Sequence, residues 1–537
     1  MVRLIRPALL FAALCCVSAG TCFLPAASVS AEDLLSPSDA SRIGMVEAWR
    51  RQLSLIGGAQ SAVDIQLHVD GSRKRHFIEV SHEKDGETHV LSRTDVNQLD
   101  AFGKPIGVEE ARRLASLQVM RWKRRGITAT LSENEIPQVR VYTLCKDGTV
   151  EARDAETGEL YWLTRNGSPY QPYLSLGVND DYVTFLNGST LYQLSAETGK
   201  VIREFEITGS PSLGSVIAGQ YALVPTTRGG IEGFHLEDSR EYPFMQRMAG
   251  RATALPTRAP GTTRTAWATD AGYVYAMETE GKPSVTFRFD TDGVVSAELA
   301  AAKGDRFFFG SENGHVYAIR ATRSGDVLWR HSIGQPIYST AFVSENQLLV
   351  SSVYKNLYCL ELATGAPLWK APVPQIDTVL ASTDDNLYAR TSVNQLTVIG
   401  AKTGARVADV SNITVEKFVI NRLTDRLYLV GAGGMLQCLR PVDSVLPQFK
   451  VVPEPTASAD PDTPAAAAQP EAPRAADPFG AGMGADPFAP AGGDAVDPFA
   501  PAGGAAADPF APADGAADPF APADGGADPF GGDPFNN

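Results

Sequence analysis

The feature that most constrains this chain is an internal repeat. A short strand pattern recurs eight times, about every 40 residues, between Cys145 and Leu439. Each copy begins with a turn such as Asp147-Gly148 or Asn313-Gly314, continues with alternating apolar residues, and turns again at a Thr-Gly pair. The alternation directs every second side chain into a core, but a single unit of four strands cannot bury both of its faces. The sequence therefore predicts an all-β fold, a β-propeller of eight four-stranded blades, with seven blades as the alternative.

The two ends of the repeat region predict how the ring closes. The last copy, Met435 to Leu439, runs into Pro441 and lacks an outer strand. Propellers commonly complete such a blade with a strand from the other terminus, and we expect this strand to come from residues 62–93. Helices are expected over 32–57, after a Ser36-Pro37 start, and over about 107–125.

Composition along the chain predicts four regions. They are a signal peptide (1–31), a helix-strand-helix segment that completes the last blade (32–126), the propeller (127–442) and a Pro/Ala/Asp/Gly-rich disordered tail (443–537).

The first residues resemble a secretory signal. Arg3 and Arg6 precede an apolar stretch from Ala8 to Val17, and small residues at Val29-Ser30-Ala31 suit cleavage. An uncleaved anchor and lipidation at a cysteine of this segment are the alternatives. No other segment is long and apolar enough to cross a bilayer, so we expect an exported protein of the periplasm or cell envelope and not an integral membrane protein.

Cysteine usage and charge limit the partners. Three cysteines, Cys145, Cys359 and Cys438, follow the signal segment, and we expect buried apolar roles for them rather than disulfides. The net charge is −15, and residues 475–537 contain ten Asp but no Lys, Arg or Glu. Nucleic acid is therefore not expected as a partner.

The tail carries the strongest functional candidate, a tripeptide Asp-Pro-Phe that occurs seven times. Proline restricts each preceding Asp to extended conformations, and several weak Phe anchors in series raise the effective concentration. We expect the tail to bind partner proteins, and a spacer without a partner is the open alternative. The predicted partner-binding residues are Phe479, Phe488, Phe499, Phe510, Phe520, Phe530 and Phe535.

Two further groups of residues have two interpretations each. His68, His76, His82 and His89 could bind a metal, but solvated positions on consecutive strands explain them better. The basic residues 121–125 fit the C-terminal end of a helix, or else a docking site for an acidic segment such as the chain's own tail.

Three tryptophans, Trp162, Trp329 and Trp369, recur at one position of the repeat. This recurrence predicts packing between blades rather than a ligand site.

The repeat, with Leu-Tyr-x-Leu strands, Thr-Gly turns and Leu-Trp outer strands, resembles that of the pyrroloquinoline quinone (PQQ)-like propeller family over about residues 130–440. This family includes quinone dehydrogenases and non-catalytic scaffolds. Its dehydrogenases commonly use an adjacent Cys-Cys disulfide, but the one such pair here, Cys15-Cys16, lies in the signal segment. A Cys-x-x-Cys-His haem motif is also absent from the sequence.

The resemblance to the BamB-like, non-enzymatic branch implies a non-catalytic scaffold. We expect a monomer without cofactor, catalytic or metal-binding residues, which binds envelope proteins and has a role in outer-membrane protein assembly. A degenerate quinone-dependent dehydrogenase and a propeller that binds a small ligand or carbohydrate are the alternatives.

Overall fold

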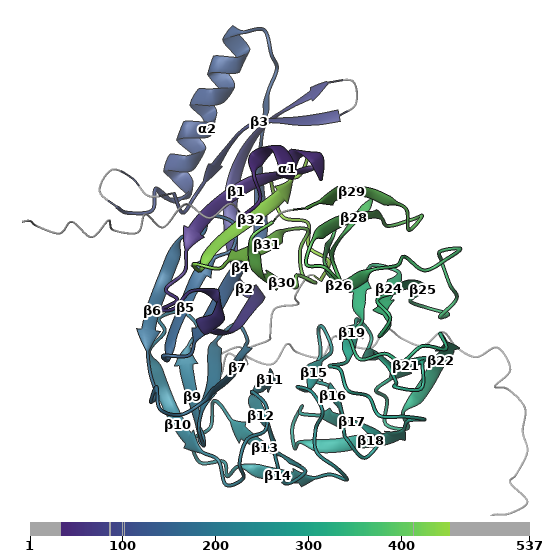
Figure 1. Cartoon of the computed structure of the whole chain (residues 1–537). Helices are drawn as coiled ribbons and strands as arrows, with labels where there is room; N and C mark the ends of the chain where they lie inside the picture. The colour runs from purple at the N-terminus through teal and green to yellow at the C-terminus, as the bar shows by residue number, and fades with distance from the viewer. Residues whose placement is uncertain (1–33, 85–86, 99, 101–102, 412, 452–537) are drawn as a thin grey trace, which may run out of the picture. The chain divides into compact units, whose positions relative to one another are not determined.

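The structure, a computed structural model, describes residues 34–84, 87–98, 100, 103–411 and 413–451. The chain divides into two units, residues 1–458 and 459–537, and all described residues belong to the first. These described residues form eight antiparallel sheets that follow one another around a ring (Figure 1). The all-β prediction is therefore confirmed.

Most sheets contain four strands that follow one another in the sequence, as the repeat predicts. The first sheet is β3-β2-β4-β5-β6, with β2 (Ala62–Lys84), β3 (Glu87–Asp95), β4 (Thr130–Cys145), β5 (Thr149–Asp154) and β6 (Leu160–Arg165). The second sheet contains β7 (Tyr173–Val178), β8 (Tyr182–Asn187), β9 (Thr190–Ser195) and β10 (Val201–Glu206), and the third contains β11 (Val216–Ala218), β12 (Tyr221–Thr226), β13 (Gly230–His235) and β14 (Phe244–Arg247). The fourth sheet contains β15 (Thr257–Arg258), β16 (Thr265–Ala268), β17 (Tyr273–Glu278) and β18 (Ser284–Asp290). The fifth contains β19 (Ala300–Ala302), β20 (Arg306–Gly310), β21 (His315–Arg320) and β22 (Asp326–Ser332). The sixth and seventh contain β23 (Phe342–Ser344), β24 (Gln347–Ser351), β25 (Leu357–Glu361); and β26 (Ile376–Ser382), β27 (Asn386–Thr391), β28 (Leu396–Gly400), β29 (Arg406–Val410).

The eighth sheet joins the two ends of the ring. It contains β30 (Val415–Val419), β31 (Leu427–Gly431), β32 (Met435–Pro441) and, as its outer strand, β1 (Met45–Gln52). An N-terminal strand thus completes the sheet, but the prediction that this strand comes from residues 62–93 is wrong. Residues 62–84 instead form β2, the inner partner of β4 in the first sheet.

The predicted helix over 32–57 is also wrong beyond its first turns. The helix α1 begins after the Ser36 cap, as expected, but spans only Pro37–Arg42. Chain reversal at Gly44, where φ is +72°, leads directly into β1. The apolar residues Ile43, Val46, Trp49 and Leu53 have helical spacing in the sequence. In the strand, a register shift between Glu47 and Trp49 puts the buried Met45 and Trp49 on opposite faces of the sheet, where they join different core clusters.

Tryptophans of the outer strands connect successive sheets. The indole Nε1 of Trp162 donates to the carbonyl of Ala196, 2.9 Å away, and its ring packs against the Thr-Gly turn at Gly199. Trp329 and Trp369 make the same bond to Leu362 and Ala401, at 3.2 and 3.0 Å. The predicted packing role of these tryptophans is confirmed.

The closing strand β1 contributes the same contact to the first sheet. Trp49 Nε1 donates to the carbonyl of Ala155 at 2.9 Å, and the ring lies against Gly158 of the Thr-Gly turn. Trp49 also packs beside Tyr428, with ring centroids 6.3 Å apart. The N-terminal strand therefore supplies both the missing hydrogen bonds of the eighth sheet and its contact with the first.

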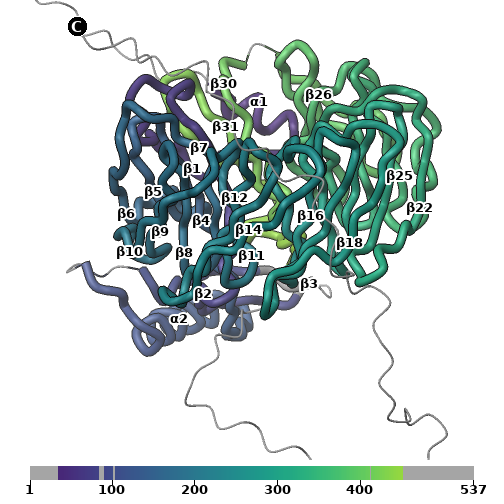
Figure 2. Tube along the Cα trace, turned by 90° about the horizontal axis from the view of Figure 1, so that it is seen from below, coloured from purple at the N-terminus to yellow at the C-terminus, as the bar shows by residue number. Residues whose placement is uncertain are grey.

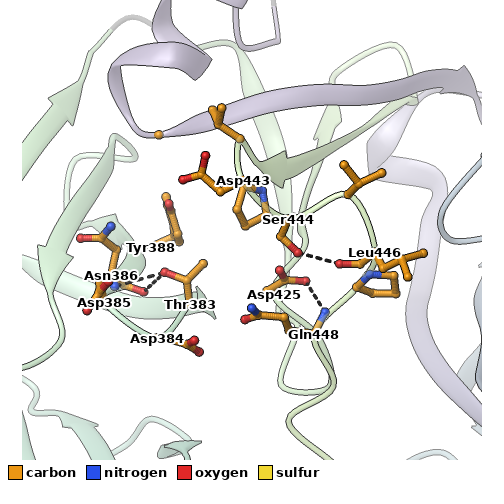
Figure 3. Close-up of a pocket in the computed structure, with 15 residues that line it drawn as sticks. Thr383, Asp384, Asp385, Asn386, Tyr388, Asp425, Asp443, Ser444, Leu446 and Gln448 are labelled. Carbon is orange, nitrogen blue, oxygen red and sulfur yellow. Dashed lines mark hydrogen bonds between the residues drawn. The ribbon is translucent and has the colours of Figure 1, made fainter. Parts of the chain in front are cut away.

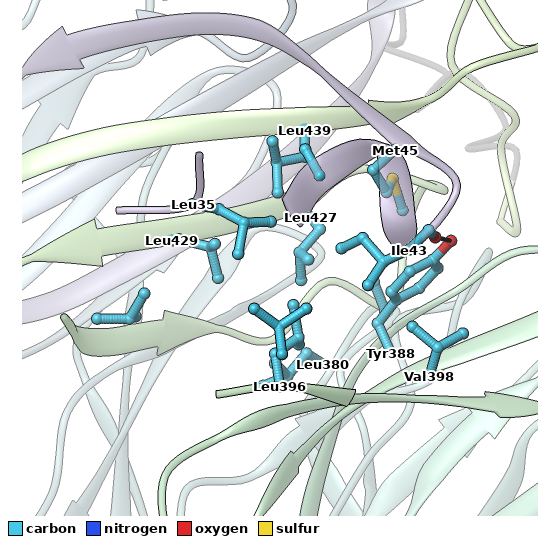
Figure 4. Packing of buried hydrophobic residues seen from close by; sticks show 14 of the residues in the cluster. Leu35, Ile43, Met45, Leu380, Tyr388, Leu396, Val398, Leu427, Leu429 and Leu439 are labelled. Atoms are coloured by element: carbon cyan, nitrogen blue, oxygen red, sulfur yellow. Dashed lines mark hydrogen bonds between the residues drawn. The ribbon is translucent and has the colours of Figure 1, made fainter. Parts of the chain in front are cut away.

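The chain before β1 belongs to the hydrophobic core. Leu35, Ile43 and Met45 pack among side chains of the seventh and eighth sheets, including Tyr388 and Leu427 (Figure 4). The amide of Gln437 accepts from the backbone N–H of Leu35 and donates to its carbonyl, both at 3.0 Å. These contacts fix the segment against the end of the ring.

An extension projects from the first sheet. Strands β2, β3 and β4 continue past the other sheets, and α2 (Gly107–Arg124) packs on them through Ala111 and Ala115. Figures 1 and 2 show α2 outside the ring. The helix expected at about 107–125 is thus present and ends before Gly126.

All three cysteines outside the signal segment are buried and free, as expected. Burial raises the pKa of the Cys359 thiol to about 12. The thiol is therefore protonated and unreactive at neutral pH.

Replacement of Gly314 by Val is expected to destabilise the fifth sheet. Gly314 has a φ of +80°, and an added Cβ would lie 2.7 Å from the backbone nitrogen of Gln335. Gly304 is a matched control, because its φ is +78° but nothing lies within 4 Å of an added Cβ. Gly304→Val should lose about 1–3 kcal/mol from strain alone, and Gly314→Val should melt at a lower temperature still. Equal melting temperatures would contradict the close contact at this turn.

Candidate protein-binding surfaces

An acidic pocket of about 560 Å³ lies between the seventh and eighth sheets (Figure 3). One wall is the turn between β26 and β27, which carries Asp384 and Asp385, and the other is the segment 441–448 after β32. Asp425 and Asp443 add two further carboxyl groups. Asp384 and Asp385 already pair with Lys450 and Lys402 at 3.2 and 3.0 Å, so a cationic side chain of a partner protein would compete with these two lysines for the pocket.

A buried arginine fixes the wall of this pocket. The side chain of Arg426 is fully buried and bonds to Glu156 at 3.0 Å and to Asp425 at 3.1 Å. It also donates to the carbonyl of Val445 at 2.9 Å, while Asp425 accepts from the backbone N–H of Gln448 at 3.0 Å. Because Glu156 belongs to the first sheet's Thr-Gly turn, Arg426 ties the segment 441–448 to both sides of the ring closure.

Burial governs the charge of Glu156. Desolvation raises the pKa of its carboxyl above the usual range, and the Arg426 guanidinium opposes this rise. Glu156 therefore depends on Arg426, because its carboxylate would otherwise lack a compensating charge, whereas Arg426 also has Asp425 as a partner.

A second surface is a groove of about 700 Å³ between the sixth and seventh sheets. Its walls are the segment 368–374, which follows β25, and the turn 402–406 between β28 and β29. Leu368, Trp369 and Val373 make its lining apolar, while Lys370 and Lys402 stand at its rim. A groove of this composition can bind an extended peptide with an apolar anchor and negative charge.

The exposed face of α2 forms a third surface. Leu117 and Met120 are 39% and 50% exposed, and Arg121, Lys123 and Arg124 occupy the last turn. The helix dipole favours cations at this end, which agrees with the simpler of the two interpretations of the basic residues 121–125. Arg125 also stacks over Trp122, with 5.1 Å from the guanidinium carbon to the ring centroid.

The histidines are dispersed over the extension. His68 Nε2 lies 2.8 Å from Asp180 Oδ1, and His76 Nδ1 lies 3.1 Å from Glu135. His82 Nδ1 lies 2.7 Å from the carbonyl of Thr128. Within the described ranges, His, Cys, Asp and Glu side chains do not gather in groups of three that could hold a metal ion.

Charged side chains also surround a pocket of about 350 Å³ that reaches the inner strands β2 and β30. Asp64 accepts from the backbone N–H of Leu176 at 2.9 Å, and burial raises the pKa of its carboxyl. Burial lowers the pKa of Lys417 and raises that of Glu298 on the same pocket. The pocket therefore holds groups of both signs in a poorly solvated setting.

The seven predicted partner-binding Phe residues lie outside the described residues. Sequence reasoning missed the acidic pocket, the groove and Trp49. A signal for Trp49 existed, because Ala48-Trp49-Arg50 matches Leu328-Trp329-Arg330 of the repeat. The prediction that the disordered tail begins at residue 443 is wrong for residues 443–448, which line the acidic pocket. This segment carried no periodic pattern, so the pocket had no comparable signal in the sequence.

No helix in the described part of the chain is both long and apolar enough to cross a membrane.

The ring of antiparallel sheets, joined by tryptophans that contact Thr-Gly turns, is consistent with a β-propeller. Residues 146–410 match the family model described as "Outer membrane protein assembly factor BamB". This match confirms the resemblance to the BamB-like branch of the PQQ-like propeller family.

Comparison with curated proteins finds no match. Among solved structures, BamB from Moraxella catarrhalis is similar at 14% identity and a TM-score of 0.45, over 57% of this chain and 92% of that chain. The computationally designed Ika8 protein is similar at 13% identity and 0.44, over 56% and 92%. Sqt1 of Saccharomyces cerevisiae is similar at 12% identity and 0.45, over 57% and 93%.

Proposed function

We propose that this protein is an exported, non-catalytic scaffold that binds proteins in the cell envelope and takes part in outer-membrane protein assembly. The observation that carries the proposal is the match of residues 146–410 to a family model with that description. The signal-like sequence at residues 1–31 supports export to the compartment where such assembly takes place.

In this proposal the eight sheets are the eight blades of one propeller, closed by β1. The acidic pocket and the apolar groove give the ring two chemically different binding surfaces. The seven tail Phe residues add weak anchors in series, which raise the effective concentration of a partner near the ring. The protein would then hold several envelope proteins together without chemistry of its own.

Loss of the protein from its native cell is expected to lower the amount of folded outer-membrane β-barrel proteins. Folded and unfolded barrels separate on gels run without heating, so the folded fraction can be measured in a deletion strain. Re-expression of the full chain should restore this fraction.

A Lys303→Ala variant serves as a control for expression, since Lys303 is an exposed residue between β19 and β20 that lines neither the acidic pocket nor the groove. An unchanged folded fraction in the deletion strain would contradict the assembly role. Quinone-dependent dye reduction by the purified protein would instead support the dehydrogenase alternative.

A further inference from the structure

The groove between the sixth and seventh sheets owes its exposed apolar wall to prolines. The sixth sheet has three regular strands, and its outer segment joins β25 only through isolated bridges at Leu360–Pro367 and Leu357–Val373. Pro367, Pro372 and Pro374 cannot donate backbone hydrogen bonds to a ladder. Leu368 is 44% exposed, and the exposed Pro372 and Pro374 extend the apolar wall beside it.

The lysines at the groove are available to a ligand. Lys402 lies 3.0 Å from Asp385, but both side chains are more than three-quarters exposed, so this pair contributes little. Arg406 donates to the carbonyl of Pro374 in the groove wall and is 3.8 Å from Asp409, so it holds the wall rather than a ligand. Lys370 adds a second, exposed cation to the rim. A ligand carboxylate can therefore replace or join this weak partner at small cost.

The chain itself contains a ligand with the matching chemistry. Each Asp-Pro-Phe tripeptide combines a carboxylate, a proline that stiffens the backbone and an aromatic anchor. Residues 475–537 contain ten Asp and no Lys or Arg, so they complement the cationic rim. The exposed side chains of Leu368, Pro372 and Pro374 form an apolar wall that suits the Phe ring.

We propose that this groove binds an Asp-Pro-Phe segment from a second copy of the chain. The inference deepens the proposed role of the tail and rests on it. This groove holds one such segment at a time, whereas the sequence supplies seven motifs. Each molecule therefore offers more motifs than it can receive, and weak single contacts between copies become multivalent.

A peptide titration tests the groove directly. The host is the full-length protein with all seven tail Phe replaced by Ala, so that its own motifs do not compete. The probe is a fluorescent peptide of residues 515–524, and its anisotropy should rise saturably with host concentration. A peptide with Phe520→Ala should bind at least about tenfold more weakly, because it loses the burial of one aromatic side chain.

Variants of the host locate the site. Leu368→Asp and Lys402→Glu should each weaken peptide binding by about tenfold or more, with unchanged melting temperatures because both side chains are exposed. Lys200→Glu is the matched control, since Lys200 follows the equivalent Thr198-Gly199 turn of the second sheet. Equal binding by all hosts, or binding that does not saturate, would overturn the assignment of the groove.

Sedimentation velocity tests whether the binding partner is a second copy of the chain. The wild-type chain should sediment faster as its concentration rises, and the variant with seven Phe→Ala replacements or with Leu368→Asp should not. Saturable peptide binding without any self-association would overturn the role of a second copy. The folded fraction of outer-membrane barrels is measured separately, so failure of this inference is distinguishable from failure of the proposed function.

Discussion

Replacement of Trp49 by Ala is expected to lower the free energy of unfolding by about 3–5 kcal/mol, the range measured for buried aromatic side chains. Trp49 is 6% exposed and packs against Gly158 and Tyr428. Its truncation also leaves the carbonyl of Ala155 without the indole donor. Because β1 contributes both the outer strand of the eighth sheet and its contact with the first, the loss weakens the closure of the ring. Urea denaturation measures the effect.

Two control variants distinguish a weakened closure of the ring from a general loss of core packing. Val46→Ala changes an exposed residue on the same strand and should cost less than about 0.5 kcal/mol. Trp162→Ala removes the equivalent tryptophan between the first and second sheets, away from the closure. Limited proteolysis should cut near residues 45–52 in Trp49→Ala only. If Trp49→Ala unfolded like Val46→Ala, β1 would not be the closing strand.

Replacement of Arg426 by Met is expected to cost about 3–5 kcal/mol at neutral pH, because it leaves buried carboxylates without their partner. Arg426 is fully buried and joins Glu156, Asp425 and the carbonyl of Val445. Met fills a similar volume, so the loss reports the charge rather than a cavity. Thermal unfolding of the variant and the wild type measures the difference.

The cost of Arg426→Met should fall as the pH is lowered. Burial already raises the pKa of Glu156 in the wild type, and Arg426 limits this rise. Without the guanidinium the native state binds the Glu156 proton more tightly than the unfolded chain does. The Arg426→Met variant therefore regains stability relative to the wild type as the pH falls through the raised pKa of Glu156. It loses this stability as the pH rises above that pKa.

The added replacement Glu156→Gln is the control for this pH dependence. The amide is neutral at every pH, so Arg426→Met/Glu156→Gln should show a smaller loss at neutral pH. Its difference from the wild type should also vary less between pH 5 and 8. A pH-independent loss in Arg426→Met itself would show that Glu156 is not the responsible group.

The repeat predicted the regular part of the fold because its signals are local. Asn-Gly and Thr-Gly turns fix hairpins, and alternation fixes which face of each strand is buried. The packing of Trp162, Trp329 and Trp369 followed from their recurrence at one repeat position. These predictions needed no knowledge of contacts between distant segments.

The closure of the ring could not be read in the same way. Pairing of β1 with β32 joins residues almost 400 positions apart in the chain, such as Gln52 and Met435. Ile43, Val46, Trp49 and Leu53 have the spacing of a helix, and pairing with β32 outweighed that local pattern. The groove was missed because its walls come from two different copies of the repeat.

The most direct test of the scaffold role is a crosslinking pull-down from the native envelope. It compares the wild-type chain with the variant in which Phe479, Phe488, Phe499, Phe510, Phe520, Phe530 and Phe535 are Ala. We predict that the wild type captures outer-membrane assembly proteins and that the variant loses part of this set while keeping the partners of the ring. Capture of no envelope protein by either form would contradict a scaffold.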